Sequence, residues 1–233
     1  MPRIVAALVC LLLSCAILPA QEPAQSTPLR KPVIPTVTYI SDWRAQDPPR
    51  YSIAVDSTGR ATYHSEPAAD PNGGTAPEPY FVEWTATDTT RNRIFELAEK
   101  ANYFHENVES KAKVADTGLK TLRYQDQSRD YSASYNFSEN PAVRELTEIF
   151  QSIEMTAELG RKLQYDARYN KLAIDQDLKY LQQAQRGHEA IEFGSVQPIL
   201  QQIAGDTSML KMAQQRAAQI LRTAGLPVEQ AQK

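Results

Sequence analysis

A short segment before a glycine turn alternates large apolar and small side chains at the period of a β-strand, and a second segment after the turn is a candidate partner strand. Residues 51–55 read YSIAV, and residues 60–64 read RATYH after the turn Ser57-Thr58-Gly59. A period of two places alternate side chains on one face of a strand, whereas a helix would scatter them around its axis. The pattern predicts a β-hairpin over residues 50–64. Its expected buried face carries Tyr51, Ile53, Val55, Ala61 and Tyr63.

Further strands and two helices are predicted around this hairpin. Strands are expected at residues 36–43 and 80–86, and a second hairpin at 118–125 and 130–137. Thr87 and Asn140 are favourable N-cap residues, and apolar residues at helical spacing follow each of them. The first helix should run from Asp88 to about Phe104, and the second should begin at Pro141. Residues 36–153 are therefore expected to form an α+β domain, an antiparallel sheet with two helices on one face.

Strand patterns end at Glu154, and residues 154–233 are predicted to be an all-α C-terminal region. The second helix should continue past the sheet domain, with Gly160 as a kink, through an apolar series made of Leu159, Leu163, Ala167, Tyr169, Leu172 and Ile174. Asp175 is expected to cap a further helix that leaves at Gly187 through a positive φ. Two last helices, 195–204 and 208–224, should pair through Val196, Ile199, Leu200, Ile203, Leu210, Ala213, Ala217, Ile220 and Leu221.

The first twenty residues have the order of a secretory signal peptide. Arg3 precedes an apolar run that ends at Leu18-Pro19-Ala20, which predicts cleavage before Gln21 and a periplasmic or extracellular protein. Residues 21–35 contain four prolines and are expected to be an extended tether. Cleavage would remove both cysteines, Cys10 and Cys15. An alternative is that Leu12-Leu13-Ser14-Cys15 acts as a lipobox, so that a lipid on Cys15 anchors the protein.

Composition argues against several classes of function. The formal charge of −3 becomes −4 when the signal segment is removed, because that segment holds Arg3 and no acidic residue. Nucleic acids and anionic membranes call for a clustered basic face, so neither is expected as a partner. The chain has three histidines, His64, His105 and His188, each in a different segment. No two of them have the sequence spacing that is typical of metal ligands on one helix. The sequence therefore predicts no catalytic residue, no cofactor-binding residue and no metal ligand.

Part of the chain resembles known bacterial proteins. Residues 51–153 resemble a pattern found in uncharacterised bacterial proteins with signal peptides. The pattern consists of a Tyr-x-Ile-x-Val strand, a glycine turn and a following strand of the form x-x-Tyr. The layout from Thr87 to Ile153 resembles the emfourin-type inhibitors of thermolysin-like metalloproteases, in which a capped helix ending in aromatics precedes a hairpin and a final helix. That resemblance implies an inhibitory role.

Aromatic residues in the predicted strands are the candidate contact residues. Trp84, Tyr80, Tyr131 and Tyr135 could form a face that binds a protein or peptide. The preferred interpretation is an exported, non-catalytic protein-interaction module of the cell envelope or periplasm, with inhibition as one form of it. The alternatives are a hydrolase whose site is assembled from distant segments, and a structural component of the envelope.

Overall fold

The computed structural model describes residues 33–68 and 78–228 of the chain. The predicted signal peptide, most of the predicted tether and nine residues of the loop between residues 66 and 79 lie outside these ranges. The described residues fall within one compact unit, Pro32–Lys233. Its fold class is α+β, as predicted.

The strands form one antiparallel sheet of six strands in the order β4-β3-β2-β1-β5-β6. They are β1 (Thr36–Asp42), β2 (Arg50–Asp56), β3 (Arg60–Glu66), β4 (Tyr80–Thr85), β5 (Leu119–Gln125) and β6 (Asp130–Tyr135). Both predicted hairpins are present. In the first of them, Asp56 closes the turn by accepting hydrogen bonds from the backbone N–H groups of Thr58 and Arg60, and Gly59 supplies the required φ of 94°.

Because successive side chains of a strand point to opposite faces, every second side chain of β2 and β3 lies in the core. Tyr51, Ile53 and Val55 of β2 are buried, as are Ala61 and Tyr63 of β3. The opposite face carries mainly small and polar residues that are half-buried or exposed. The one-sided hairpin predicted from the alternation is confirmed.

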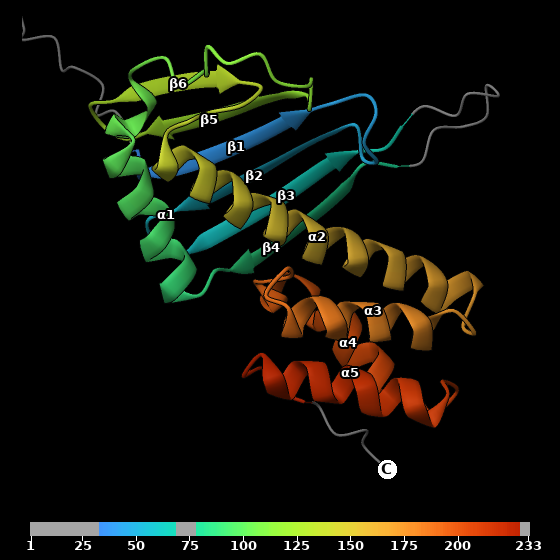
Figure 1. Cartoon of the computed structure of the whole chain (residues 1–233). Helices are drawn as coiled ribbons and strands as arrows, with labels where there is room; N and C mark the ends of the chain where they lie inside the picture. Colours follow the sequence, from blue (N-terminus) through green and yellow to red (C-terminus); the bar gives the residue numbers. More distant parts are fainter. Residues whose placement is uncertain (1–32, 69–77, 229–233) are drawn as a thin grey trace, which may run out of the picture. The chain divides into compact units, whose positions relative to one another are not determined.

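Two helices cover the buried face of the sheet, α1 (Asp88–Lys100) and α2 (Pro141–Tyr169), as Figure 1 shows. Thr87 caps α1 by accepting from the N–H of Thr90. Asn140 caps α2 in the same way, with Pro141 at its first position. After α1 the chain makes a 3-10 turn, η1 (Asn102–Phe104), with three consecutive positive φ angles.

The C-terminal region is helical, as predicted, and it shares helix α2 with the domain before it. It contains α3 (Ile174–Arg186), the 3-10 turn η2 (Phe193–Val196), α4 (Gln197–Gly205) and α5 (Lys211–Thr223). The first half of α2 packs on the sheet, and Leu163 and Ala167 of its second half belong to the core of the helical region. The boundary predicted between residues 153 and 154 therefore falls inside one uninterrupted helix of 29 residues.

Gly160 does not kink α2, contrary to the prediction, because the helix runs through it with regular backbone angles. A Cβ atom at this position would lie 2.3 Å from Cγ1 of Val196. The glycine is therefore needed for the close approach of η2 to α2.

Three other local predictions in the helical region are wrong. Helix α3 begins at Ile174 after Ala173, so Asp175 lies in its first turn and is not its cap. Gly187 ends this helix with a φ of −80°, and the positive φ occurs at His188. Leu210 is exposed at the start of α5, and Met209 takes its place in the contact with α4.

Candidate functional site

A row of four tyrosines crosses the buried face of the sheet diagonally. Tyr39, Tyr51, Tyr63 and Tyr80 come from β1, β2, β3 and β4 in turn, with ring centroids 6.0, 5.9 and 6.1 Å apart. Phe150 of α2 stacks on Tyr39 with the ring centroids 5.2 Å apart. The row places phenol hydroxyls under α2, and α2 carries acidic side chains at this point.

Glu158 of α2 receives hydrogen bonds from two side chains of β3 and from one of its own helix. The Tyr63 hydroxyl and the Ser65 hydroxyl donate to its Oε1 at 2.6 and 2.8 Å. Arg161 donates to Oε2 at 2.5 Å. These three hydrogen bonds fix the position of the Glu158 carboxyl group.

One turn earlier on α2, Glu154 lines a pocket of about 570 Å³. We call it the Glu154 pocket; its walls are Asp47, Glu154, Met155, Glu158, Leu159, Arg161, Lys162, Tyr165 and Tyr180. Burial raises the pKa of Glu154 from 4.5 to about 7, with a further increase from the charges of Glu158 and Asp47. Among the described residues, no side chain donates a hydrogen bond to it.

Two buried hydroxyls neighbour Glu154. Those of Tyr39 and Tyr51 have no hydrogen-bond partner in the part of the chain that the structure describes. Burial raises the pKa of both phenols, and the charge of Glu154 adds to the increase for each. Both tyrosines therefore stay neutral and keep unused hydrogen-bonding capacity beside the carboxyl group.

Negative charge predominates around the pocket. Its second cation, Lys162, donates to Asp166 at 2.8 Å and to Asp177 at 2.7 Å. In and around the pocket there are thus two basic side chains, Arg161 and Lys162, and five carboxyl groups. The carboxyl groups are those of Asp47, Glu154, Glu158, Asp166 and Asp177. Within residues 33–68 and 78–228, Asp47 and Glu154 form no ion pair with a basic side chain.

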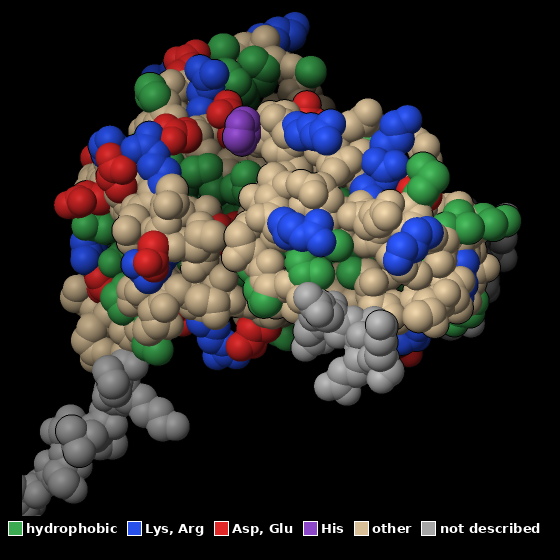
Figure 2. Space-filling model, turned by 90° about the horizontal axis from the view of Figure 1, so that it is seen from below, with side chains coloured by type: hydrophobic (Ala, Val, Ile, Leu, Met, Phe, Trp, Pro, Cys, Tyr) green, Lys and Arg blue, Asp and Glu red, His purple; other side chains and the backbone are tan. Residues whose placement is uncertain are grey.

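Exposed tyrosines form the rim of the same pocket and extend beyond it. Tyr165 and Tyr180 line the pocket and are 62% and 48% exposed, and Tyr169 is 71% exposed with its ring 4.9 Å from that of Tyr165. We call these three residues the tyrosine surface. Figure 2 shows apolar side chains at the right-hand edge of the molecule. In Figure 1, α2 ends and α3 begins on this same side. Tyr169 and Leu172 belong to the apolar series predicted in this region, and both are exposed.

The four predicted contact residues do not come together. Trp84 and Tyr135 are 6% and 3% exposed, which contradicts the outward orientation that a binding role for them requires. Tyr131 is half-buried on β6, where its ring packs edge-on against His105. Tyr80 is half-buried on β4, at the other edge of the sheet, next to Tyr63 and Gln164. Among the described residues, these four side chains therefore form no single exposed aromatic face.

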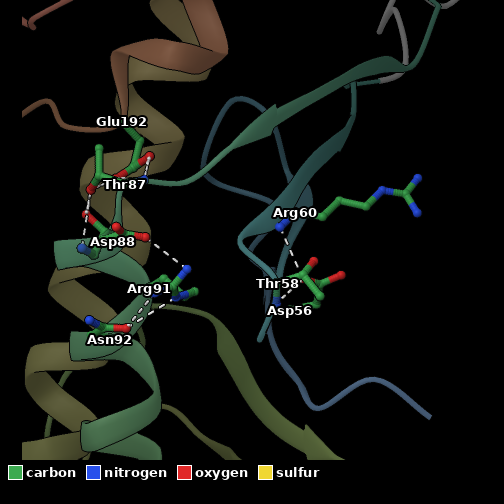
Figure 3. A network of polar contacts seen from close by, with 9 residues as sticks. Asp56, Thr58, Arg60, Thr87, Asp88, Arg91, Asn92 and Glu192 are labelled. Atoms are coloured by element: carbon green, nitrogen blue, oxygen red, sulfur yellow. Dashed lines mark hydrogen bonds and ion pairs between the residues drawn. The ribbon is translucent and has the colours of Figure 1, made fainter. Parts of the chain in front are cut away.

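Trp84 is buried because the C-terminal region covers it. Its indole N–H donates to Oε2 of Glu192 at 3.1 Å. The same carboxylate accepts from the N–H of Thr87 at 3.1 Å and from the Thr87 hydroxyl at 2.7 Å. Figure 3 shows Glu192 directed at Thr87, at the N-terminus of α1, where the helix dipole favours a negative charge. This network joins the sheet to the helical region.

A second pocket contains a buried lysine whose hydrogen-bonding capacity is already used. Lys120 donates to the carbonyl oxygens of Thr117 and Asn136 at 3.1 and 3.0 Å, and to the Thr117 hydroxyl at 2.9 Å. An ammonium group has three donors, so none is left for a ligand. No group of three His, Cys, Asp or Glu residues in the described ranges is arranged to hold a metal ion.

Neither a protein-family model nor a curated protein matches this chain. The resemblance to emfourin-type inhibitors therefore stays a prediction, and the argument for function depends on the chain's own residues. The tyrosine surface had a signal in the sequence, because Tyr165 and Tyr169 are four residues apart and fall on one side of a helix. No comparable sequence pattern indicated that α3 and α4 cover the opposite side of α2.

The raised pKa of Glu154 predicts a stability that decreases with pH. The carboxyl group has a pKa of about 7 in the folded chain and 4.5 in the unfolded chain. Its contribution to the stability of the fold is therefore complete below pH 4.5 and is lost as the pH rises through 7. Because the pocket opens to solvent, we expect a loss of about 2 kcal/mol between pH 5 and pH 8, less than the full linkage. Urea denaturation at both pH values should show this loss in the native chain and not in Glu154→Gln. Glu99→Gln, at an exposed position on α1, is the control, and equal pH dependence of both variants would contradict the assignment.

Proposed function

We propose that this protein is an exported, non-catalytic protein-interaction module of the cell envelope or periplasm, and that it binds its partner through the tyrosine surface. The observation that carries the proposal is the exposure of Tyr165 and Tyr180 at the Glu154 pocket, with the exposed ring of Tyr169 next to that of Tyr165. Tyrosine contributes a large contact area at a low cost in side-chain entropy and is enriched in binding hot spots.

The arrangement supports binding in a second way. A rim of aromatic residues around a pocket allows an inserted side chain to be enclosed and shielded from water, as in the centre of a protein interface. Tyr165 and Tyr180 come from different helices, α2 and α3, which pack on each other through Leu163 and Leu178. The two rings are therefore held by a rigid framework, which lowers the entropic cost of binding.

Export is proposed from the pattern of the first twenty residues, with cleavage before Gln21. No helix in the described part of the chain is both long enough and apolar enough to cross a membrane. Anchoring through a lipid on Cys15 is the alternative. Mass spectrometry of the mature N-terminus distinguishes the two: a chain that begins at Gln21 supports the soluble form, and a diacylglyceryl-cysteine at Cys15 supports the anchored form.

Loss of the tyrosine surface is expected to weaken partner binding at least about tenfold, because hot-spot tyrosines contribute about 2 kcal/mol or more each. Residues 21–233 serve as bait in an envelope extract of the source organism, and the captured protein is then titrated with purified bait by calorimetry. Tyr165→Ala combined with Tyr180→Ala is the test variant. Phe81→Ala is the matched control, because Phe81 is a 60% exposed aromatic on β4. Equal affinity of the two variants, or no specific partner at all, would count against the proposal.

A hydrolase is the second candidate, and the two glutamates on α2 favour it. Glu154 has a pKa of about 7, and the carboxyl group of Glu158, one turn later, is held in place by hydrogen bonds from Tyr63, Ser65 and Arg161. Two neighbouring carboxyl groups in different environments can act as general acid and general base. Turnover in a broad hydrolase screen that disappears in Glu154→Gln would establish this function in place of the first.

The inhibitory form of the module follows from the resemblance of residues 87–153 to emfourin-type inhibitors. We expect the purified chain to reduce the activity of a thermolysin-like protease when it is titrated at micromolar concentration. Unchanged protease activity over this range would remove inhibition and leave the interaction module itself untouched.

A further inference from the structure

We propose that the Glu154 pocket binds the side chain of a lysine or arginine that the partner protein inserts between Tyr165 and Tyr180. The inference names the chemistry of the partner and rests on the proposed function. It is carried by the charges left unpaired in the pocket, the aromatic walls of its mouth and the buried polar groups beside it.

The unpaired charges are both negative. Arg161 is bound to Glu158, and Lys162 is bound to Asp166 and Asp177, so each cation in the pocket already has a partner. Asp47, from the loop between β1 and β2, and Glu154 have none among the described residues. A cation that enters the pocket would meet two carboxyl groups without displacing an existing ion pair, whereas an anion would have to break one.

The mouth of the pocket suits the stem and the head of a basic side chain. Tyr165 and Tyr180 present aromatic rings, which attract an ammonium or guanidinium group through their π faces and cover the methylene stem. Met155 and Leu159 supply apolar contact along the wall. The volume of about 570 Å³ accommodates one such side chain together with water.

The polar groups next to Glu154 provide a second, independent indication of a ligand. Tyr39 and Tyr51 are fully buried, yet their hydroxyls have no hydrogen-bond partner in the described structure. Buried polar groups are nearly always hydrogen-bonded, so the two unpartnered hydroxyls behind Glu154 indicate that a polar partner is missing there. A water molecule held between these hydroxyls and the bound cation would give them a partner.

Binding should become tighter as pH rises. A cation binds the carboxylate form of Glu154, and this form grows as pH passes through about 7, so the affinity should increase several-fold between pH 6 and pH 8. The titratable and charged groups that face Glu154 are Asp47, Glu158, Arg161, Tyr39, Tyr51 and Tyr63. The three phenols stay neutral over this range because burial raises their pKa values.

The test uses residues 21–233 and three capped tripeptides, Gly-Lys-Gly, Gly-Arg-Gly and Gly-Glu-Gly, followed by NMR chemical shifts at pH 6 and pH 8. We expect saturable shifts at Leu159, Tyr165 and Tyr180 with the two basic peptides, stronger at pH 8, and none with the acidic peptide. Asp47→Asn combined with Glu154→Gln should weaken the binding at least tenfold and remove its pH dependence. Glu99→Gln should change neither.

Two outcomes would overturn the inference: no shifts with either basic peptide at millimolar concentration, or equal shifts in the double variant. Binding of a free diamine without binding of the peptides would overturn it as well. Failure here is distinguishable from failure of the proposed function. A partner that depends on Tyr165 and Tyr180 but not on Asp47 and Glu154 keeps the interaction module and removes the basic anchor. Peptide binding without any protein partner keeps the pocket and removes the module.

Discussion

Replacing Glu192 by alanine is expected to lower the free energy of unfolding by about 3 kcal/mol, because it leaves two donors on the sheet side without an acceptor. These are the indole N–H of Trp84, which is buried, and the backbone N–H of Thr87. The substitution also removes a negative charge from the N-terminus of α1. Chemical denaturation followed by tryptophan fluorescence, to which Trp43 and Trp84 both contribute, measures the loss.

The control for this substitution lies three residues earlier. Glu189 is exposed, so Glu189→Ala should change the stability by less than about 0.5 kcal/mol. Trp84→Phe removes the indole donor alone, and the double variant with Glu192→Ala should lose less than the sum of the two single losses. Strict additivity would show that the indole and the carboxylate do not interact.

Replacing Gly160 by leucine is expected to destabilise the fold by about 3 kcal/mol, although leucine favours a helix more than glycine does. The reason is that even a Cβ atom at this position would lie 2.3 Å from Cγ1 of Val196, a buried β-branched residue with little freedom to move. The surrounding core has no room for the rest of the side chain. Thermal and urea denaturation measure the loss.

Gly205 provides the matched control, because a Cβ atom there meets no heavy atom within 4 Å. Gly205→Ala should leave the stability unchanged or raise it by up to about 1 kcal/mol. A compensating pair tests the contact itself: Gly160→Ala with Val196→Ala should lose less than the two single variants together. If Gly160→Leu behaved like Gly205→Ala, the close approach of η2 to α2 would be wrong.

Local patterns in the sequence predicted most of the secondary structure and the buried side of the sheet. Alternation identified Tyr51, Ile53 and Val55 as core residues, and the caps Thr87 and Asn140 placed the starts of α1 and α2. These features depend on neighbours within a few residues along the chain, so they can be read without knowledge of the fold. The sequence also predicted that no strand follows Glu154, and residues 154–228 of the structure contain none.

The candidate site, by contrast, depends on contacts between residues far apart in the chain. Trp84 was interpreted as a contact residue, but Glu192, 108 positions away, covers it. Gly160 was interpreted as a kink, but the approach of Val196 gives it a packing role. Tyr165 and Tyr180 stay exposed, although both lie on amphipathic helices, because α4 and α5 cover the other sides of α2 and α3.

The sequence by itself therefore determined which segments become strands and helices and which face of the sheet is buried. Only the tertiary structure decided that Asp47, Glu154 and Glu158 meet under two exposed tyrosines, and that burial raises the pKa of Glu154 to about 7. The physical reason is one of range. Periodicity and capping act within one or two turns of the chain, whereas desolvation and the pairing of charges depend on which distant surfaces come into contact.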